Sequence, residues 1–461
     1  MMMQKEKTVG KAKTVGTLFS GNDLKKLIFP LIIEQILAVS VGMVDTMMVS
    51  SAGEAATSGV SLVDIINVLI INIFAAVATG GAVVASQYLG QKRKDRACQS
   101  ADQLILVTGV VALVIMTLSI LFRWQILNLI YKGVTEEVMK NAVIYLTISA
   151  ISYPFLAVYN SCAALFRSMG NSKISMQASI IMNVINVIGD ALFIFGFHWG
   201  IKGAAWATVI GQIVSGIMVI VYFGRFRKME LKKEMFRPRG HLLKMILSLG
   251  MASCINQIAM AVVQITMNNT LRYYGAASVY GTDIPLACVG VISKVNMVFM
   301  AIAIGISQGC QPIWGYNYGA GSYDRVKRTY WKAFRVAMTV GIVFFLCFQF
   351  FPTQLVSIFG TGSKEYYEFA ARYFRIFMFM TFVNGIQPMS SGFFTSIGKA
   401  KLGIVVSLTR QVIFLLPLIL IFPIFMGIDG VMYAGPIADA AAGIVAIGFA
   451  VKEIRAMDKI A

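Results

Sequence analysis

Charge is scarce in this sequence, because charged residues make up only 13% of its 461 residues, whereas a soluble domain carries roughly 25%. Hydrophobic residues make up 57% of the chain, and the mean hydropathy is +0.74. Such a composition excludes an ordinary soluble domain. It predicts a polytopic membrane protein whose immediate partner is the lipid bilayer.

Histidine and paired cysteine are also nearly absent, which limits the chemistry open to the chain. Only His198 and His241 occur, and neither belongs to an HExxH pattern. The six cysteines are scattered without a CxxC pair, as expected of small buried side chains. Because no ligand set for metal or prenyl chemistry is present, we expect neither an enzyme nor an organic cofactor.

Acidic residues are half as frequent as basic ones, with 21 Asp and Glu against 40 Lys and Arg and a net charge of +19. The basic residues lie in short segments between apolar runs, chiefly 91–96, 167–173, 225–244, 323–328, 398–401 and 451–459. This arrangement follows the positive-inside rule and argues against nucleic-acid binding. We therefore expect a multi-pass protein of the inner (cytoplasmic) membrane with both termini in the cytoplasm.

Apolar windows of about 20 residues, the length needed to cross the hydrocarbon core, predict an all-α integral membrane protein. Twelve transmembrane helices are expected near 27–49, 62–84, 103–122, 138–159, 174–197, 203–223, 245–270, 284–306, 334–352, 366–388, 402–425 and 430–450. The chain then divides into a cytoplasmic N-terminal tail (1–23), a first lobe (24–224), a cytoplasmic linker (225–244), a second lobe (245–451) and a C-terminal tail (452–461). The polar, basic start is too long for a signal peptide.

The two halves of the chain resemble each other. The segment FRSMGNSK (166–173) recurs as FTSIGKAK (394–401), and GIKGAAWA (200–207) recurs as GIDGVMYA (427–434). Six spans per half is an even number, so both halves enter the membrane from the same side. The sequence thus predicts two pseudo-symmetric six-helix lobes in a parallel repeat, with a transport site between them.

Several oxygen-bearing side chains of the first half fall at one depth in the membrane. Asp45 lies roughly 7–8 Å below the outer end of the first span, and Asp190 lies about 10 Å deep in the fifth. Thr208 and Tyr145 come to a similar level in the sixth and fourth spans. Asn186 shares a helix face with Asp190, one turn away. These five side chains are expected to converge in the outer half of the first lobe.

Two carboxylates close together in a membrane need either a shared proton or a bound cation. The Asn186 amide and the Thr208 hydroxyl suit a sodium ion at Asp45 and Asp190, whereas Tyr145 suits a proton network. These residues are compatible with either Na⁺ or H⁺ as the bound ion. The competing interpretation is that these side chains only form hydrogen bonds between helices.

The second half lacks the acids. The repeat places Val263 at the position of Asp45 and Leu418 at that of Asp190, so the fold does not require a carboxylate there. Pro30 lies fifteen residues before Asp45 and removes a helical hydrogen bond, which allows a bend in the first span. Proline is also common in membrane helices for other reasons.

Other polar residues lie within the predicted spans. Lys294, Arg410 and Asp439 in the second half predict an ion pair facing the protein interior, which is either structural or exchanges partners during a cycle. Glu34, near the cytoplasmic entrance, either meets a cationic substrate or pairs with a lysine. Asn183 is expected to support the network around Asp45 and Asp190. Gln257 and Gln264 either line a wet cavity or bridge helices.

The chain resembles the multidrug and toxic compound extrusion (MATE) family over almost its whole length after the N-terminal tail. The resemblance rests on the two six-span halves, on PLIIEQILAVSVGMVDTMMV (30–49) and on GISQGCQPIWGYNYGAGSYDRVKR (305–328). The second segment looks like bacterial MepA-type members, on the DinF-like side of the family.

The resemblance implies export of amphipathic, usually cationic compounds, coupled to Na⁺ or H⁺ and driven by rocking of two lobes. It implies a coupling-ion site in the first lobe at Asp45, Asn186, Asp190 and Thr208, with Tyr145 and Asn160 as nearby polar positions. It also links bending at Pro30 to transport. The NorM-like branch of the family uses acidic residues in spans seven and ten. Span seven of this chain contains no acidic residue. A monomer is expected, because the transport path is complete within two lobes.

The alternative function is a flippase of lipid-linked precursors from the wider related superfamily. Such flippases usually carry extra spans and a cationic cavity for pyrophosphate. Here the cavity candidates are mostly acids in the first half, with Lys294 and Arg410 in the second, so export of cations is the preferred interpretation.

Overall fold

The structure is a computed structural model that describes residues 21–51, 53–131, 135–225, 237–281, 283–359 and 362–459. Every regular element in these ranges is a helix, as the sequence predicts for an all-α integral membrane protein. The expected N-terminal tail up to residue 20 and the middle of the expected linker, 226–236, lie outside the described residues.

The first half of the chain forms α1 (Gly21–Ser50), α2 (Glu54–Gly90), α3 (Lys94–Leu121), α4 (Arg123–Ile130), α5 (Glu136–Ala150), α6 (Tyr153–Ser168), α7 (Ser172–Asp190), the π-helix η1 (Ala191–Gly196) and α8 (Ile201–Arg225). The second half forms α9 (Gly240–Ala276), α10 (Asp283–Gly319), α11 (Tyr323–Phe350), α12 (Pro352–Ser357), α13 (Lys364–Phe377), α14 (Thr381–Asn384), α15 (Ile386–Ser396), α16 (Ala400–Leu408), the π-helix η3 (Thr409–Leu415), α17 (Leu416–Met426) and α18 (Ile428–Asp458).

Ten helical stretches among the described residues are long and apolar enough to cross a membrane, and α5 with α6 makes an eleventh that is bent by 49°. The bend follows from Pro154, which lacks an amide hydrogen and therefore starts α6. The remaining predicted span, 366–388, is divided among α13, α14 and α15. The prediction of about twelve membrane helices is confirmed, although two of them are broken rather than continuous.

The internal repeat is visible in where the helices begin. α3 begins at Lys94 and α11 at Tyr323, 229 residues later, while α7 begins at Ser172 and α16 at Ala400, 228 residues later. The short helices α4 and α12 follow α3 and α11 in the same way. Even the two broken spans occupy equivalent places, because the break before α6 matches the one before α14.

The turns that end α6 and α15 have the same geometry. Each contains a glycine in the left-handed region, with φ of 85° at Gly170 and 84° at Gly398. In each, the residue after the glycine donates its amide hydrogen over 2.9 Å to the carbonyl oxygen of a phenylalanine, Phe166 or Phe394. Only glycine adopts this φ without strain, which explains why the paired segments of the sequence both keep it.

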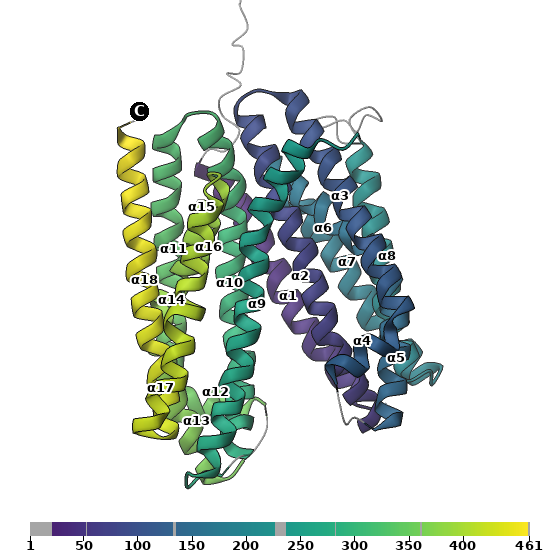
Figure 1. The fold of residues 1–461 in the computed structure, drawn as a ribbon, viewed down its shortest axis with the longest axis vertical. Helices are drawn as coiled ribbons and strands as arrows, with labels where there is room; N and C mark the ends of the chain where they lie inside the picture. Colours follow the sequence, from purple (N-terminus) through teal and green to yellow (C-terminus); the bar gives the residue numbers. More distant parts are fainter. Residues whose placement is uncertain are drawn as a thin grey trace, which may run out of the picture.

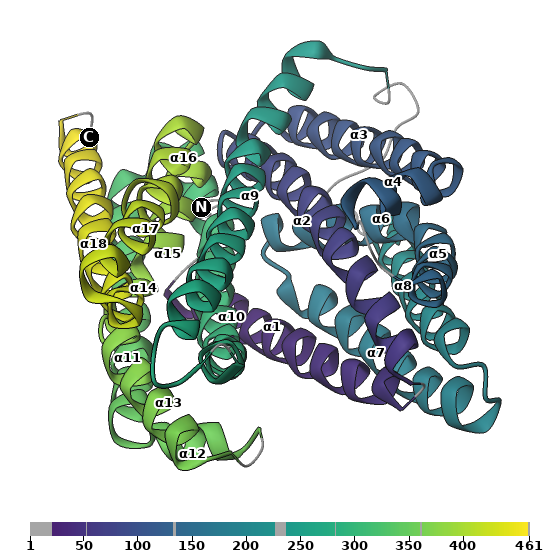
Figure 2. The same ribbon diagram turned by 60° about the horizontal axis from the view of Figure 1, so that its bottom comes forward.

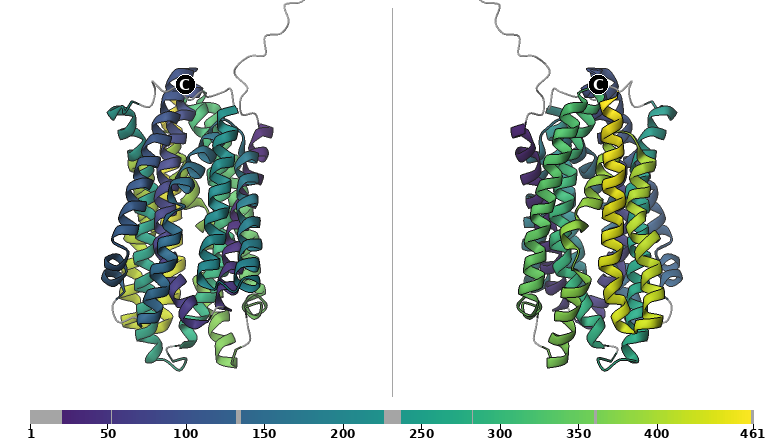
Figure 3. Two further views of the ribbon diagram at one scale, coloured as in Figure 1. Left: turned by 90° about the vertical axis from the view of Figure 1, so that its right-hand side faces the viewer. Right: turned by 90° about the vertical axis from the view of Figure 1, so that its left-hand side faces the viewer.

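The helices of the two halves form two groups that diverge toward one end of the molecule (Figure 1). The other end, here called the basic end, carries the turns at 91–93, 169–171, 320–322 and 397–399 together with the C-terminus of α18. α9 and α10 stand between the rest of the second half and helices α1 and α2 (Figure 2). Side views show long helices that run roughly parallel from one end to the other (Figure 3).

The two groups touch closely in the half of the molecule nearer the basic end. A Cβ added to Gly90 would lie 2.0 Å from the carbonyl oxygen of Tyr316, and one added to Gly319 would lie 2.2 Å from that of Gln87. A Cβ on Gly80 would lie 2.2 Å from the carbonyl oxygen of Ile246. Small residues let membrane helices approach to this degree, where van der Waals packing replaces the hydrophobic effect.

Candidate functional site

A cavity of about 680 Å³ lies between the two groups of helices. From the first half its wall takes residues of α1, α2, α5, α6, α7 and α8, and from the second half residues of α9, α10, α15 and α16. Its charged lining residues are Glu34, Asp45, Asp64 and Arg167. The cavity therefore has both halves as walls, and its carboxylates come from the first half.

Asp45 and Asp190 bring their carboxyl groups together at the edge of this cavity. The two side chains interact directly, and Asp190 is completely buried. Both carboxylate oxygens of Asp190 and Oδ1 of Asp45 are buried without a hydrogen-bond donor among the described residues. Two acceptor groups in this position repel each other unless a proton or a cation lies between them.

Asn186 and Thr208 lie beside the two acids. The Asn186 amide nitrogen donates a 3.0 Å hydrogen bond to the Thr208 hydroxyl, which in turn donates to the carbonyl oxygen of Ala204 at 3.1 Å. This leaves the Asn186 side-chain oxygen available as an acceptor. The contact forms because α7 and α8 approach closely. A Cβ added to Gly189 would lie only 2.8 Å from the Cβ of Ala207.

The backbone changes where Asp190 ends α7. The next six residues, Ala191–Gly196, form the π-helix η1. Single π-helical turns inside longer helices are frequent at functional sites, because they shift the side chains on either side of them. No π-helix was expected within the predicted fifth span, 174–197.

Tyr145 and Asp64 complete the cluster. Tyr145 is buried and interacts with Asp64, Asp45, Asp190 and Thr208. Asp64 lies within the second predicted span, 62–84, and was not among the side chains placed at the depth of Asp45. A carboxylate inside a predicted span was the signal that could have found it, because ionisable residues within membrane helices are rare and usually functional.

These residues fit a small cation, or a shared proton, held by two carboxylates and neutral oxygens. Carboxylate, amide and hydroxyl oxygens are the ligands that hard cations prefer. In the ranges that the structure describes, no three His, Cys, Asp or Glu side chains are arranged to hold a metal ion. Asn186 and Thr208 would therefore have to supply the remaining oxygens beside Asp45 and Asp190.

The equivalent layer of the second half is apolar. Val263, the counterpart of Asp45, is buried in a hydrophobic cluster, and Phe414 and Leu418, the counterparts of Asn186 and Asp190, pack against the same cluster. The two halves thus share a fold but differ in chemistry at this depth.

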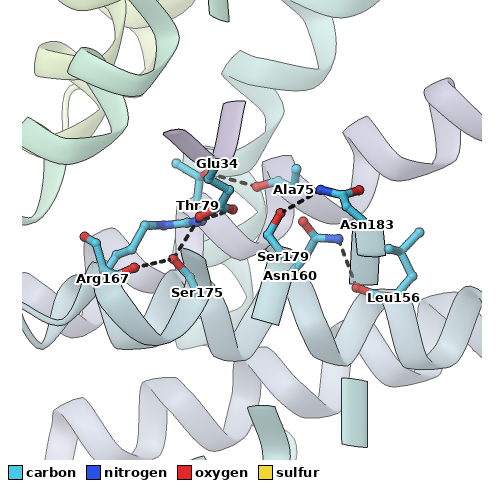
Figure 4. A network of polar contacts seen from close by, with 10 residues as sticks. Glu34, Ala75, Thr79, Leu156, Asn160, Arg167, Ser175, Ser179 and Asn183 are labelled. Atoms are coloured by element: carbon cyan, nitrogen blue, oxygen red, sulfur yellow. Dashed lines mark hydrogen bonds and ion pairs between the residues drawn. The ribbon is translucent and has the colours of Figure 1, made fainter. Parts of the chain in front are cut away.

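Glu34 is the centre of a second polar network, nearer the basic end (Figure 4). Its carboxylate lies 3.8 Å from the Arg167 guanidinium and accepts a 3.0 Å hydrogen bond from the Ser175 hydroxyl. Glu34 thus has an arginine as its partner, where the sequence suggested a lysine or a cationic substrate. It also lines the cavity.

Asn160 and Asn183 lie close to this network (Figure 4). Asn160 donates to the carbonyl oxygen of Leu156 at 2.9 Å, and Asn183 donates to the Ser179 hydroxyl at 3.4 Å (Figure 4). Both asparagines line the cavity, but neither has a hydrogen bond to the acids in the described structure. Pro30 lies inside α1, which is continuous from Gly21 to Ser50.

In the second half, Arg410 and Asp439 form an ion pair with 2.5 Å between Nε and Oδ1. Asp439 is buried, and neither residue lines the cavity. Lys294 is exposed and takes no part in any ion pair with described residues. The pair therefore joins η3 to α18 away from the cavity.

The two glutamines named on α9 have different positions. Gln257 lines the cavity and donates a 3.1 Å hydrogen bond to Asn72 of the first half. Gln264 is exposed outside the cavity and donates to Asn268, one turn along the same helix. Sequence reasoning missed Gln308, Gln311 and Gln387, which also line the cavity.

Comparison with known proteins agrees with this architecture. The family model MatE matches residues 30–192 and 252–421. The uncharacterized transporter YisQ of Bacillus subtilis is 26% identical over 343 residues, covering 73% of each chain. The multidrug export protein MepA of Staphylococcus saprophyticus is 24% identical over 425 residues, covering 91% of this chain and 90% of its own.

The fold also matches that of solved structures. An outward-facing multidrug resistance MATE family transporter superposes with a TM-score of 0.88 at 18% identity, covering 94% of this chain and 96% of its own. The family model covers most of the chain, and the fold contains the two repeated groups of membrane helices. The chain is a multi-pass membrane protein that belongs to the MatE family of transporters, with relatives in its MepA-type bacterial branch.

Proposed function

We propose that this protein is a cation-coupled antiporter that exports small, mostly cationic molecules across the cytoplasmic membrane. The observation that carries the proposal is the facing pair Asp45 and Asp190, whose buried oxygens have no donor. A sodium ion or a proton satisfies this pair, and its departure leaves two like charges in a low-dielectric setting. Loading therefore changes the free energy of the first half strongly enough to drive a conformational change.

The close approaches between glycines and helix backbones at the basic end support alternating access. They hold that end shut while the cavity lies on the other side of the contact. In the proposed cycle two lobes, 24–224 and 245–451, rock about this contact, and Pro30 allows α1 to bend. The basic end faces the cytoplasm by the positive-inside rule, so both termini are cytoplasmic. A monomer carries out transport without catalysis or an organic cofactor.

The charges of the cavity favour a cationic substrate over an anionic one. The cavity contains three carboxylates and one guanidinium group among its described lining residues. A flippase for pyrophosphate-linked lipids would need the opposite balance. The MepA relatives are named as multidrug export proteins, which agrees with export of small molecules.

The test is transport in proteoliposomes with sodium and proton gradients imposed separately, using a panel of aromatic and hydrophilic cations. One gradient is expected to drive transport, and Asp45→Asn is expected to abolish it while leaving a folded protein. Asp283→Asn is the matched control, because Asp283 is exposed at the start of α10. Gradient-driven export by the Asp45→Asn variant at the wild-type rate would overturn the coupling role.

A further inference from the structure

Lys294 is a lysine inside a membrane helix without a partner of opposite charge in this conformation. It follows Asp283, the first residue of α10, by eleven residues, which places it about 16 Å along the helix. Its side chain is exposed and forms no ion pair with any described residue. A charge at this depth is costly unless it faces water or a carboxylate. Lys294 is therefore expected to face a hydrated space in this conformation, or a carboxylate in another one.

Lys294 lies on the face of α10 that is turned toward the first half. Gly305 follows it by eleven residues, or about three helical turns, so the two residues share a face of the helix. A Cβ added to Gly305 would lie 3.1 Å from the backbone of Ile32 on α1. Farther from the basic end, α1 and α10 separate (Figure 1). This face of α10 is therefore in contact with the first half at Gly305 and faces away from any contact with it at Lys294.

The parallel arrangement of α2 and α10 places Lys294 at the height of Asp64. The two helices meet at the basic end, where Gly90 ends α2 and Gly319 ends α10. From these glycines, Asp64 lies 26 residues back along α2 and Lys294 lies 25 residues back along α10, which is about 39 and 38 Å. Two arms that close about one contact bring together the points at equal distance from it. Rocking about the basic end would therefore bring Lys294 toward Asp64.

The antiparallel arrangement of α1 and α10 gives the same height. Ile32 of α1 lies beside Gly305 of α10. Eleven residues back along α10 is Lys294, and eleven residues onward along α1 is Met43, two residues before Asp45. Two helices of the first half thus independently place the lysine level with the acids of the cavity.

We propose that Lys294 and Asp64 form an ion pair that closes the divergent end of the molecule, opposite the basic end, when the two halves rock. Asp45 already interacts with Asp190, whereas Asp64 lines the cavity and has the neutral Tyr145 as a neighbour. In the present structure the halves diverge at that end, and the lysine is unpaired among the described residues. The proposal rests on the alternating access of the proposed function and names the contact that stabilises its other state.

The test measures how often the divergent end is closed, using the full-length protein in lipid nanodiscs. Spin labels at the exposed positions Glu137 of α5 and Val279, between α9 and α10, report the distance between the halves by pulsed electron resonance. Spectra are recorded with and without sodium, at acidic and at neutral pH. Lys294→Met and Asp64→Asn are each expected to lower the population with the short distance roughly tenfold, as the loss of a hydrogen bond between charged groups would. The double variant should lower it no further, because both changes remove the same interaction.

Two controls separate this role from a general effect of charge. Lys364→Met is the matched control, because Lys364 is an exposed lysine at the start of α13 in the same half, and it should leave the distances unchanged. Lys294→Arg keeps the positive charge and should retain the closed population. Ion-binding isotherms of Lys294→Met should match those of the wild type, since Asp45 and Asp190 are intact, while its gradient-driven export falls.

The possible outcomes distinguish this pair from the transport function on which it rests. A wild type that transports and closes, with a closed population that Lys294→Met leaves unchanged, overturns the pair and leaves the function in place. A loss of closure in Lys294→Met but not in Asp64→Asn overturns Asp64 as the partner. A wild type that never closes and exports nothing under either gradient overturns both. If Lys294→Met lowers the melting temperature, Asp64→Asn decides the test by itself.

Discussion

The side chain of Gln87 on α2 donates a 2.8 Å hydrogen bond to the backbone carbonyl oxygen of Ser396, the last residue of α15. The last carbonyl groups of a helix have no partner within it, so a donor from another helix satisfies one of them. The turn that follows is fixed in place, because Lys399 pairs with Glu453 of α18 at 2.7 Å. The Gln87 amide thus joins the first half of the chain to the second at the basic end.

The first prediction concerns this tie. Gln87→Leu removes a hydrogen bond worth about 0.5–1.5 kcal/mol, which should increase the population with an open basic end roughly two- to tenfold. Spin labels at the exposed positions Arg96 and Arg328, read by pulsed electron resonance, report the distance between the halves. An unchanged distance distribution would show that the bond does not hold the halves together.

The matched control for this variant is Gln349→Leu. Gln349 makes the same kind of bond, from its side-chain nitrogen to the carbonyl oxygen of Arg375 at 3.0 Å. Both partners of that bond belong to the second half. The control should therefore leave the distance between the halves unchanged.

The second prediction concerns the contact between α2 and α10. Gly90→Ala would place a Cβ 2.0 Å from the carbonyl oxygen of Tyr316, so the helices must separate and the melting temperature should fall. Gly109→Ala on α3 meets nothing within 4 Å. Since Ala is favoured over Gly inside helices by roughly 0.5–1 kcal/mol, this control should stabilise. Equal thermal shifts in the two variants would refute the importance of the contact.

The third prediction concerns the buried pair Arg410 and Asp439. Asp439→Leu alone leaves a buried guanidinium without its partner and should cost about 3–5 kcal/mol. The double variant Arg410→Met/Asp439→Leu removes both charges and should recover most of that loss in thermal unfolding. Because the pair lies outside the cavity, the double variant should also transport with the wild-type KM. A double variant that is stable but inactive would instead place the pair in the transport cycle.

The fourth prediction separates the acids of the first half. Asp190→Asn should remove most of the sodium or proton dependence of transport, because Asp190 faces Asp45 directly. Asp64→Asn should have a smaller effect, because Asp64 reaches the pair through Tyr145 and the charge of Asp45. Ion-binding isotherms for the purified variants provide the measurement. Identical isotherms for wild type and Asp190→Asn would contradict the assignment.

The sequence was sufficient to predict the helices and the internal repeat. Apolar length predicted their number, and the paired segments around Gly170 and Gly398 predicted turns that have the same geometry. The breaks in the fourth and tenth spans were missed, because their residues remain apolar through the bend. The boundaries of the two lobes stay a prediction.

Depth counting placed Asp45, Asp190, Asn186 and Thr208 in one layer, and the structure brings them together; their role in ion binding stays a prediction. Counting could not reveal the partner of Glu34, because Arg167 lies on another helix whose rotation depends on packing. It also could not show that the glutamines of α10 face the cavity. Side-chain direction depends on how helices pack against each other, which one chain's hydropathy pattern does not contain.

The unequal chemistry of the two halves has an electrical consequence. A membrane potential acts on net charge, with about 2.3 kcal/mol per elementary charge for each 100 mV. Among the described residues, the buried acids of the second half belong to neutral ion pairs, Asp439 with Arg410 and Glu453 with Lys399, on which the potential exerts no net force. In the proposed cycle the voltage across the membrane therefore acts on the first half, whose loaded and empty acids differ in charge. Two halves with one fold thus respond differently to the same electric field.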